Sequence, residues 1–273
     1  MKKIYLYPIA LTLAFGLYSC NNSPNKLSTK VTQDTTAVEV LPFGFETVTI
    51  EKEGPQDMNV HYKYTVDYPS QGPEDLVQLV RKHIFQGLGD STLTNDFSKE
   101  DLDRIGQQFV DKSVAEIKAY QEEEDAREIG YGDEGSFKVV ENNDRILTYH
   151  LEGYLYTGGA HGMPINQYLT FDKSQCKVLT WDDLFLTEKL DSLGQLIREE
   201  LNVQYYKEYP RDWKDEVFPF KLPKQTPVLT SEGVMFNYEA YEVDCYAAGM
   251  PHCTLPYSRI SSWMTAPAKA LIP

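Results

Sequence analysis

The stretch YTGGAHG, residues 156–162, combines three glycines with one histidine between two segments that are typical of strands. Only small residues flank His161, so we expect an exposed imidazole that titrates near neutral pH and could serve as a ligand contact or an acid/base group. A phosphate-binding loop needs a helix directly after its glycines, whereas Met163 and Pro164 lead into another strand. The Lys-Ser/Thr pair of a P-loop and a GxSxG elbow are also absent. The sequence therefore excludes a nucleotide-binding loop.

Two interpretations of this loop stay open. Glycine adopts positive φ without strain, so a tight hairpin connection would explain Gly158 and Gly159 completely. Alternatively, the loop also contacts a ligand, and Tyr156, Gly158, Gly159 and His161 are then candidate binding residues.

Tyrosine is abundant, at 19 residues, and three tyrosines crowd the segment NYEAYEVDCYAAGMPHC, residues 237–253. They could cover the edge of a core. They could also form a binding surface, because tyrosine offers a large contact area with little loss of entropy. On the second interpretation, Tyr241 and Tyr246 join the candidate ligand-binding residues.

No catalytic or metal-binding pattern emerges from the sequence. The histidines at 61, 83, 150, 161 and 252 form no HxxxH, HxH or HExxH spacing, so we expect neither a metal nor a cofactor. The carboxylates of Glu239, Glu242 and Asp244 cluster, but such clustering arises by chance in an acidic chain and does not identify a glycosidase pair. We therefore expect a protein that is not an enzyme and has no catalytic residue.

The N-terminus is typical of a lipoprotein signal peptide. Lys2 and Lys3 precede an uncharged run at 4–18 that is too short to span a bilayer. The run ends in LYSC, which resembles a lipobox, so residues 1–19 are expected to be cleaved before a lipidated Cys20. An ordinary signal peptide with a coincidental cysteine is the alternative. We expect the lipidated cysteine and a flexible tether over 20–43, and a protein attached to the membrane by its lipid alone.

This anchoring places the protein in the cell envelope. Asn21 and Asn22 form no acidic sorting signal after the lipidated cysteine, which favours the outer membrane with the protein facing the periplasm. Among the remaining cysteines, Cys245 and Cys253 are close in sequence and form a candidate disulfide in an oxidising compartment. No CxxC occurs, so neither a redox dithiol nor a zinc ribbon is predicted.

The chain is strongly acidic, with a formal net charge of −15. Removing residues 1–19 takes away two of the 26 basic residues and leaves 24 against 41 acidic ones, a net charge near −17. Nucleic acid would be repelled, and a basic partner would be attracted. We expect a monomer.

Alternating strands and amphipathic helices must position these residues. Segments 45–54 and 58–69 alternate apolar and polar residues and predict an antiparallel pair, followed by one helix that starts near Ser70 and Pro73 and another capped by Ser98. Three further strands follow, SFKVVENN, DRILTYHLEGYLY and INQYLTFD. In the second, Leu147, Tyr149, Leu151 and Leu155 share one face, and Thr148, His150 and Glu152 share the other.

The C-terminal part continues with the short helix TWDDLF, a helix capped by Thr187, the strands TPVLT, GVMFNY and HCTLPY, and a closing turn SRISSWM. Runs of strands alternate with runs of helices and no βαβ repeat occurs. The predicted fold class is therefore α+β, with antiparallel sheets and helices packed on them. We expect two closely associated subdomains, at 44–172 and 173–267.

The segments YTGGAHG, YLTFD, LTWDDLF, SEGVMFNYEAYEVDCYAAG and TLPYSRI resemble an extracytoplasmic family of two parts. The first part is similar to a PdaC-type N-terminal domain and the second to the RsiV-type domain of anti-sigma factors. The resemblance implies a compact α+β structure and a region known as a lysozyme-binding sensor. The sigma-binding segment, the transmembrane helix and the deacetylase domain with its Asp-His-His site are not found here. Only the binding role is expected to carry over.

The sequence thus predicts a lipid-anchored, non-catalytic envelope protein that binds a basic, lysozyme-like protein or a cell-wall glycan such as peptidoglycan. Two alternatives remain. One is a peptidoglycan-acting hydrolase in which His161 works with a nearby carboxylate. The other is a structural envelope lipoprotein with no small ligand.

Overall fold

The structure, a computed structural model, describes residues 42–89, 97–122, 129–213 and 220–272. The expected signal peptide, Cys20 and nearly all of the expected tether lie outside the described residues. Leu41–Pro273 forms one compact unit. No helix in the described ranges is both long and apolar enough to cross a membrane.

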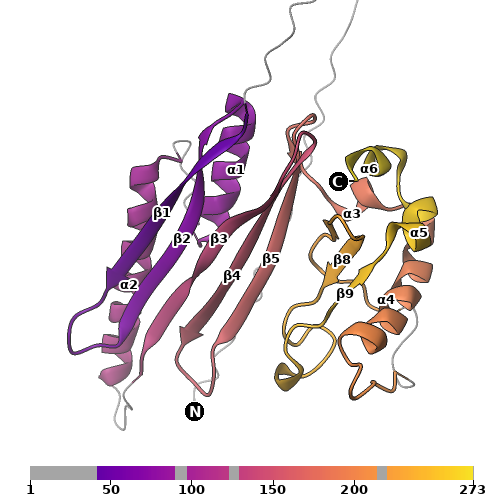
Figure 1. The fold of residues 1–273 in the computed structure, drawn as a ribbon. Helices are drawn as coiled ribbons and strands as arrows, with labels where there is room; N and C mark the ends of the chain where they lie inside the picture. Colours follow the sequence, from indigo (N-terminus) through magenta and orange to yellow (C-terminus); the bar gives the residue numbers. More distant parts are fainter. Residues whose placement is uncertain (1–41, 90–96, 123–128, 214–219, 273) are drawn as a thin grey trace, which may run out of the picture. The chain divides into compact units, whose positions relative to one another are not determined.

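A six-stranded sheet dominates the first half of the fold, with its strands side by side in sequence order (Figure 1). The strands are β1 (Gly44–Glu53), β2 (Val60–Gln71), β3 (Tyr131–Asn142), β4 (Ile146–Thr157), β5 (Met163–Asp172) and β6 (Lys177–Val178). All neighbouring pairs are antiparallel except β2 and β3, which are parallel. The predicted antiparallel pairing does not extend to β2 and β3, because two helices separate these strands and return the chain to the same end of the sheet.

These two helices, α1 (Glu74–Gly87) and α2 (Lys99–Gln121), pack on one face of the sheet (Figure 1). The predicted cap of the second is confirmed, because the Ser98 side chain accepts a hydrogen bond from the Asp101 amide. Ser70 belongs to β2 instead of the start of α1, which begins after Pro73 without a side-chain cap. Proline fits there because it lacks the amide hydrogen that the first turn leaves unpaired.

The core of this half lies between the sheet and the helices. Leu147, Tyr149 and Leu151 of β4 are buried in it, as their alternation predicts. The Tyr64 hydroxyl donates a hydrogen bond of 2.6 Å to the carboxylate of Asp133 inside the same layer. Burial raises the pKa of both groups, so the phenol stays neutral at every physiological pH.

A second, smaller sheet has the antiparallel order β7 (Val228–Leu229), β8 (Val234–Asn237) and β9 (His252–Leu255). It packs with α3 (Trp181–Leu184), α4 (Leu190–Gln204), α5 (Tyr257–Ile260) and α6 (Ala266–Leu271) around a core of its own. Short 3-10 turns cover Thr187–Lys189, Tyr246–Ala248 and Ser261–Trp263. The structure thus confirms the α+β class.

The sequence predicted Thr187 as the N-cap of α4, and this prediction is wrong. Thr187 opens the 3-10 turn Thr187–Lys189, and the helix begins one turn later at Leu190 with Lys189 as its N-cap residue. The short helix α3 instead carries a capping box, in which Thr180 and Asp183 pair reciprocally.

The predicted pairing of Cys245 with Cys253 is not present, and both are free thiols. Strand β9 directs Cys253 into the core, where it is fully buried, its sulfur lying 3.9 Å from the Ile197 carbonyl oxygen. Cys245 is exposed in the loop that precedes β9. Burial also raises the pKa of the Cys253 thiol to about 12, so it behaves as a small apolar side chain.

Candidate functional site

The hairpin between β4 and β5 carries the glycine–histidine loop. Gly158 and Gly159 have φ of 82° and 90°, which confirms the conformational reason for glycine at both positions. A Cβ atom on Gly162 would lie 2.6 Å from the Leu155 carbonyl oxygen, so this glycine permits a close backbone approach. The Tyr156 hydroxyl donates to the Gly159 carbonyl at 3.0 Å and closes the loop on itself.

The loop brings His161 against two tyrosines from the loop between β8 and β9. The Tyr246 ring stacks on the imidazole with 3.9 Å between centroids and 22° between planes. The Tyr241 hydroxyl lies 3.2 Å from His161 Nε2. Three of the candidate residues, distant in sequence, therefore meet at one place.

A fourth aromatic side chain, Tyr154 of β4, completes this group. Its hydroxyl oxygen accepts a hydrogen bond of 2.8 Å from the Gly162 amide. A hydrogen bond with Tyr154 also raises the pKa of Tyr246. We call Tyr154, His161, Tyr241 and Tyr246 the tyrosine–histidine cluster. Tyr154 was not among the predicted residues, although it continues the strand face of His150 and Glu152, and extending that alternation would have indicated it.

The hydrogen bonds of His161 indicate which tautomer the neutral ring adopts. Its Nδ1 lies 3.0 Å from the Gly162 carbonyl oxygen, which can only accept, so Nδ1 carries the hydrogen. Nε2 then accepts from the Tyr241 hydroxyl. Within the described part of the chain, the hydrogen-bond partners of this imidazole are a backbone carbonyl and a tyrosine hydroxyl.

The loop that carries Tyr241 is held by Glu242, a buried carboxylate. It accepts hydrogen bonds from the backbone amides of Lys224 at 2.8 Å and Glu239 at 2.9 Å. Tyr241, next to it, takes the left-handed conformation with φ of 67° and is 55% exposed. Glu242 therefore fixes a strained turn that presents the tyrosine ring to solvent.

The other acidic residues of this segment have separate structural partners. Asp244 accepts a hydrogen bond from Tyr206 at 3.1 Å and pairs with Arg211 at 3.2 Å. Glu239 lies 3.6 Å from Lys224. The three carboxylates that are close in the sequence thus have separate partners, and these contacts shape the loop.

Of the remaining candidates, Tyr156, Gly158 and Gly159 shape the hairpin and lie beside the cluster without joining it. Among the described residues no group of three or more His, Cys, Asp and Glu side chains is arranged to hold a metal ion. The cluster offers aromatic faces, hydroxyl groups and one imidazole, which is the chemistry of a contact surface.

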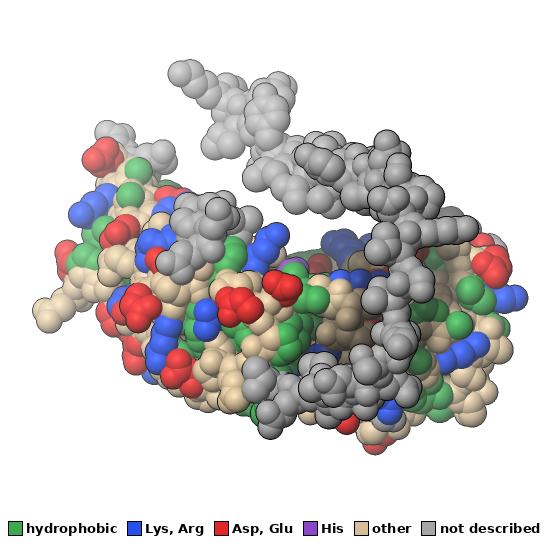
Figure 2. Space-filling model, turned by 90° about the horizontal axis from the view of Figure 1, so that it is seen from above, with side chains coloured by type: hydrophobic (Ala, Val, Ile, Leu, Met, Phe, Trp, Pro, Cys, Tyr) green, Lys and Arg blue, Asp and Glu red, His purple; other side chains and the backbone are tan. Residues whose placement is uncertain are grey.

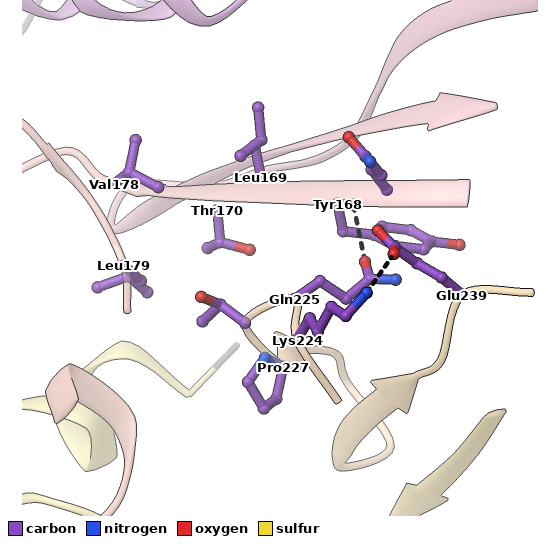
Figure 3. A pocket seen from close by; sticks show the side chains of 11 residues that line it. Tyr168, Leu169, Thr170, Val178, Leu179, Lys224, Gln225, Pro227 and Glu239 are labelled. Atoms are coloured by element: carbon purple, nitrogen blue, oxygen red, sulfur yellow. Dashed lines mark hydrogen bonds and ion pairs between the residues drawn. The ribbon is translucent and has the colours of Figure 1, made fainter. Parts of the chain in front are cut away.

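A cavity of about 310 Å³ lies between strand β5 and residues 224–227, next to the loop between β8 and β9 (Figure 3). Gln225 connects its two sides, because its amide group donates to the Asn166 carbonyl at 3.0 Å and accepts from the Tyr168 amide at 3.3 Å. One primary amide thus satisfies two backbone groups on the outer edge of β5. Lys224 also lines the cavity and pairs at 3.6 Å with Glu239, which lies close to the Tyr168 ring (Figure 3).

Comparison with known families agrees with this two-part architecture. The sequence model of a family described as deacetylase PdaC matches residues 57–164, and that of a protein family of unknown function, DUF3298, matches residues 182–258. The order of domains expected from the sequence is confirmed. No curated protein matches the chain.

Solved structures with a similar fold include two members of the DUF3298 family. A DUF3298 family member from Bacteroides fragilis is 18% identical, with a TM-score of 0.73, and the match covers 84% of this chain and 97% of that one. A DUF3298 family protein from Pseudomonas aeruginosa is 20% identical, with a TM-score of 0.55, and the match covers 84% of this chain and 96% of the other.

Proposed function

Because residues 57–164 match the PdaC family model and residues 182–258 match the DUF3298 model, we propose that the chain is a lipid-anchored envelope protein that binds a basic, lysozyme-like protein. The tyrosine–histidine cluster is the contact surface. The observation that carries the proposal is the exposure of Tyr241 on a turn held by two hydrogen bonds to the buried carboxylate of Glu242. A rigid, exposed tyrosine contributes strongly to protein interfaces because little entropy is lost on binding.

The charge of the chain supports a basic partner. The net charge of −15 attracts a cationic protein and speeds its encounter. On the face seen in Figure 2 the acidic side chains are interspersed with Lys and Arg instead of forming one patch. Charge therefore contributes steering, while the aromatic cluster contributes the specific contact.

The test is titration of the whole chain with lysozyme. We expect binding at about 0.05 M salt, and binding at least about tenfold weaker at about 0.5 M, because screening removes the long-range attraction. Replacing both Tyr241 and Tyr246 with alanine should weaken binding by about 30-fold, the effect of losing about 2 kcal/mol at an interface centre.

Tyr209→Ala is the matched control, since Tyr209 is 83% exposed and lies outside the cluster. It should bind like the wild type. Absence of binding at low salt would remove the basic-protein proposal. If the double variant and the control bound lysozyme with equal affinity, this would contradict the proposal that the tyrosine–histidine cluster is the contact surface.

The anchor is tested separately by Cys20→Ser. Wild-type protein should sediment with the membrane fraction and carry a lipid mass on its N-terminal peptide, because two acyl chains give stable attachment. The variant should lose the lipid mass and partition with the soluble fraction. A Cys20→Ser protein that stays with the membrane would contradict lipid anchoring.

The alternative function is peptidoglycan hydrolysis through His161. The hydrogen bonds of this imidazole to Tyr241 and to the Gly162 carbonyl favour the binding role. Release of muropeptides by the wild type and its loss in His161→Ala would instead support the hydrolase.

A further inference from the structure

Strand β1 is an outer strand of the six-stranded sheet, with β2 on one side and, among the described residues, no strand on the other (Figure 1). The Gly54 amide donates to the Val60 carbonyl at 2.8 Å and continues the β1–β2 register, in which Glu53 faces His61, as a hydrogen-bonded pair. Such pairs alternate with non-bonded pairs along two antiparallel strands. The backbone N–H and C=O groups that point to the open edge are therefore those of Thr47, Thr49, Glu51 and Glu53.

This edge is accessible in the part of the chain that the structure describes. The four residues are exposed, and no hydrogen bond from another described segment reaches their backbone groups. A row of unpaired backbone groups is a template for pairing with another strand, and charged side chains often block it. The charges of β1 that face α2 are Glu46, which pairs with Lys99 at 2.9 Å, and Lys52, which pairs with Asp103 at 3.2 Å.

The spacing of these two charges makes β1 complementary to a second copy of itself. When two copies of β1 pair antiparallel about a two-fold axis at Thr49, Glu46 lies directly opposite Lys52 of the partner subunit. The same axis joins the outward backbone groups of Thr49 to those of its own copy. Each Glu46 then lies between two lysines, and each Lys52 lies between two carboxylates. Charges that would repel another strand therefore favour this one.

Neighbouring registers lack this match. Moving the axis by one residue toward either end of β1 places Glu46 opposite Ile50 or Gly54 of the partner subunit, and neither carries a charge. The helices also fit the register at Thr49. Helix α2 contacts both β1 and β2, so its copy would lie two strand spacings away, about 10 Å. This is the ordinary distance between packed helices.

We propose that two copies of this chain associate through β1, with the two-fold axis at Thr49, and form one sheet that continues across both molecules. The proposal replaces the monomer that we expected from the sequence. It does not depend on the tyrosine–histidine cluster, which is formed by other strands and loops, so either proposal can fail without the other.

Cysteine cross-linking tests the register. Thr49→Cys should form a disulfide-linked dimer under mild oxidation, because its two Cα atoms would lie about 5.5 Å apart, within the roughly 4.4–6.8 Å range of disulfides. Thr47→Cys is the matched control and should form no cross-link, because its two copies would lie about 13 Å apart. A mixture of Thr47→Cys and Glu51→Cys should cross-link. The variants are made in a background that removes the other accessible thiols, Cys20→Ser, Cys176→Ser and Cys245→Ser.

Thr49→Pro tests the backbone pairing. Proline removes an amide that points to the open edge and not to β2, and an edge strand accepts proline at such a position. Sedimentation of the whole chain with Cys20→Ser, which keeps any lipid from driving association, should give the mass of a dimer at about 50 µM. Thr49→Pro should raise the dissociation constant at least about tenfold, and Thr49→Val should leave it unchanged.

The cysteine variants at 47, 49 and 51 replace exposed residues, so they decide the question even if Thr49→Pro fails to fold. A chain that stays monomeric at about 0.5 mM would overturn the proposal. So would equal cross-linking of Thr49→Cys and Thr47→Cys, or a dimer that Thr49→Pro leaves intact.

Discussion

Gly135→Ala is expected to lower the free energy of unfolding by about 3 kcal/mol, measured by urea denaturation. Gly135 of β3 faces Gly153 of β4 in the sheet. A Cβ atom at position 135 would lie 2.1 Å from the Glu152 carbonyl oxygen and 2.9 Å from the Tyr64 ring. Backbone cannot yield as a flexible side chain does, so the β3–β4 pairing would have to shift.

The pair of glycines makes room for the Tyr64 phenol, which reaches Asp133 beneath them. Gly87→Ala is the matched control, because its new Cβ atom would meet Leu151 Cδ2 at 3.4 Å and the Phe137 ring at 3.8 Å, both ordinary contacts. We expect a change of under about 1 kcal/mol for the control. If Gly135→Ala unfolded at the same urea concentration as Gly87→Ala, this would contradict the claim that the close approach at the glycine pair stabilises the sheet.

Glu242→Ala is expected to cost about 2–4 kcal/mol of unfolding free energy, because two hydrogen bonds to a buried, charged acceptor would be lost. These are the amides of Lys224 and Glu239, which a single carboxylate joins across two loops. The same change should weaken lysozyme binding, since the turn that presents Tyr241 loses its support. Denaturation and binding are measured on the same protein preparation.

Glu242→Gln keeps one side-chain acceptor, so it should lower the free energy of unfolding by about half as much as Glu242→Ala. Glu232→Ala, an exposed glutamate on a neighbouring turn, should change stability by less than about 0.5 kcal/mol. A Glu242→Ala protein as stable as the Glu232→Ala control would show that the carboxylate does not hold the two loops together.

Local patterns in the sequence predicted much of the first sheet. The alternation in β4 placed Leu147, Tyr149 and Leu151 in the core, and the structure agrees because side chains on a strand alternate between two faces. The cap at Ser98 was also predictable, because it depends on residues within one helical turn. Such features are local and need no knowledge of the fold.

Long-range features were not predictable from the same patterns. The parallel pairing of β2 with β3 depends on how α1 and α2 pack between them, which no single strand encodes. The expected disulfide failed for a similar reason, since the register of β9 decides that Cys253 faces the core. Proximity in sequence said nothing about the direction of its side chain.

The candidate site depends on local features, which were predictable, and on a long-range contact, which was not. Residue types and glycine spacing indicated His161, Tyr241 and Tyr246 as binding residues, but not that they meet. The contact joins residues 80 positions apart, and it exists because the hairpin and the turn fixed by Glu242 approach each other. The cavity at Tyr168 left no signal in the sequence, because its wall is shared between β5 and the segment before β7.

Hydrogen exchange of the whole chain, with and without saturating lysozyme, locates the contact surface most directly. Slower exchange is predicted at the amides of residues 157–162 and 239–249, the two segments that form the tyrosine–histidine cluster. Unchanged exchange in both segments, with protection elsewhere on the chain, would contradict the assignment of this surface.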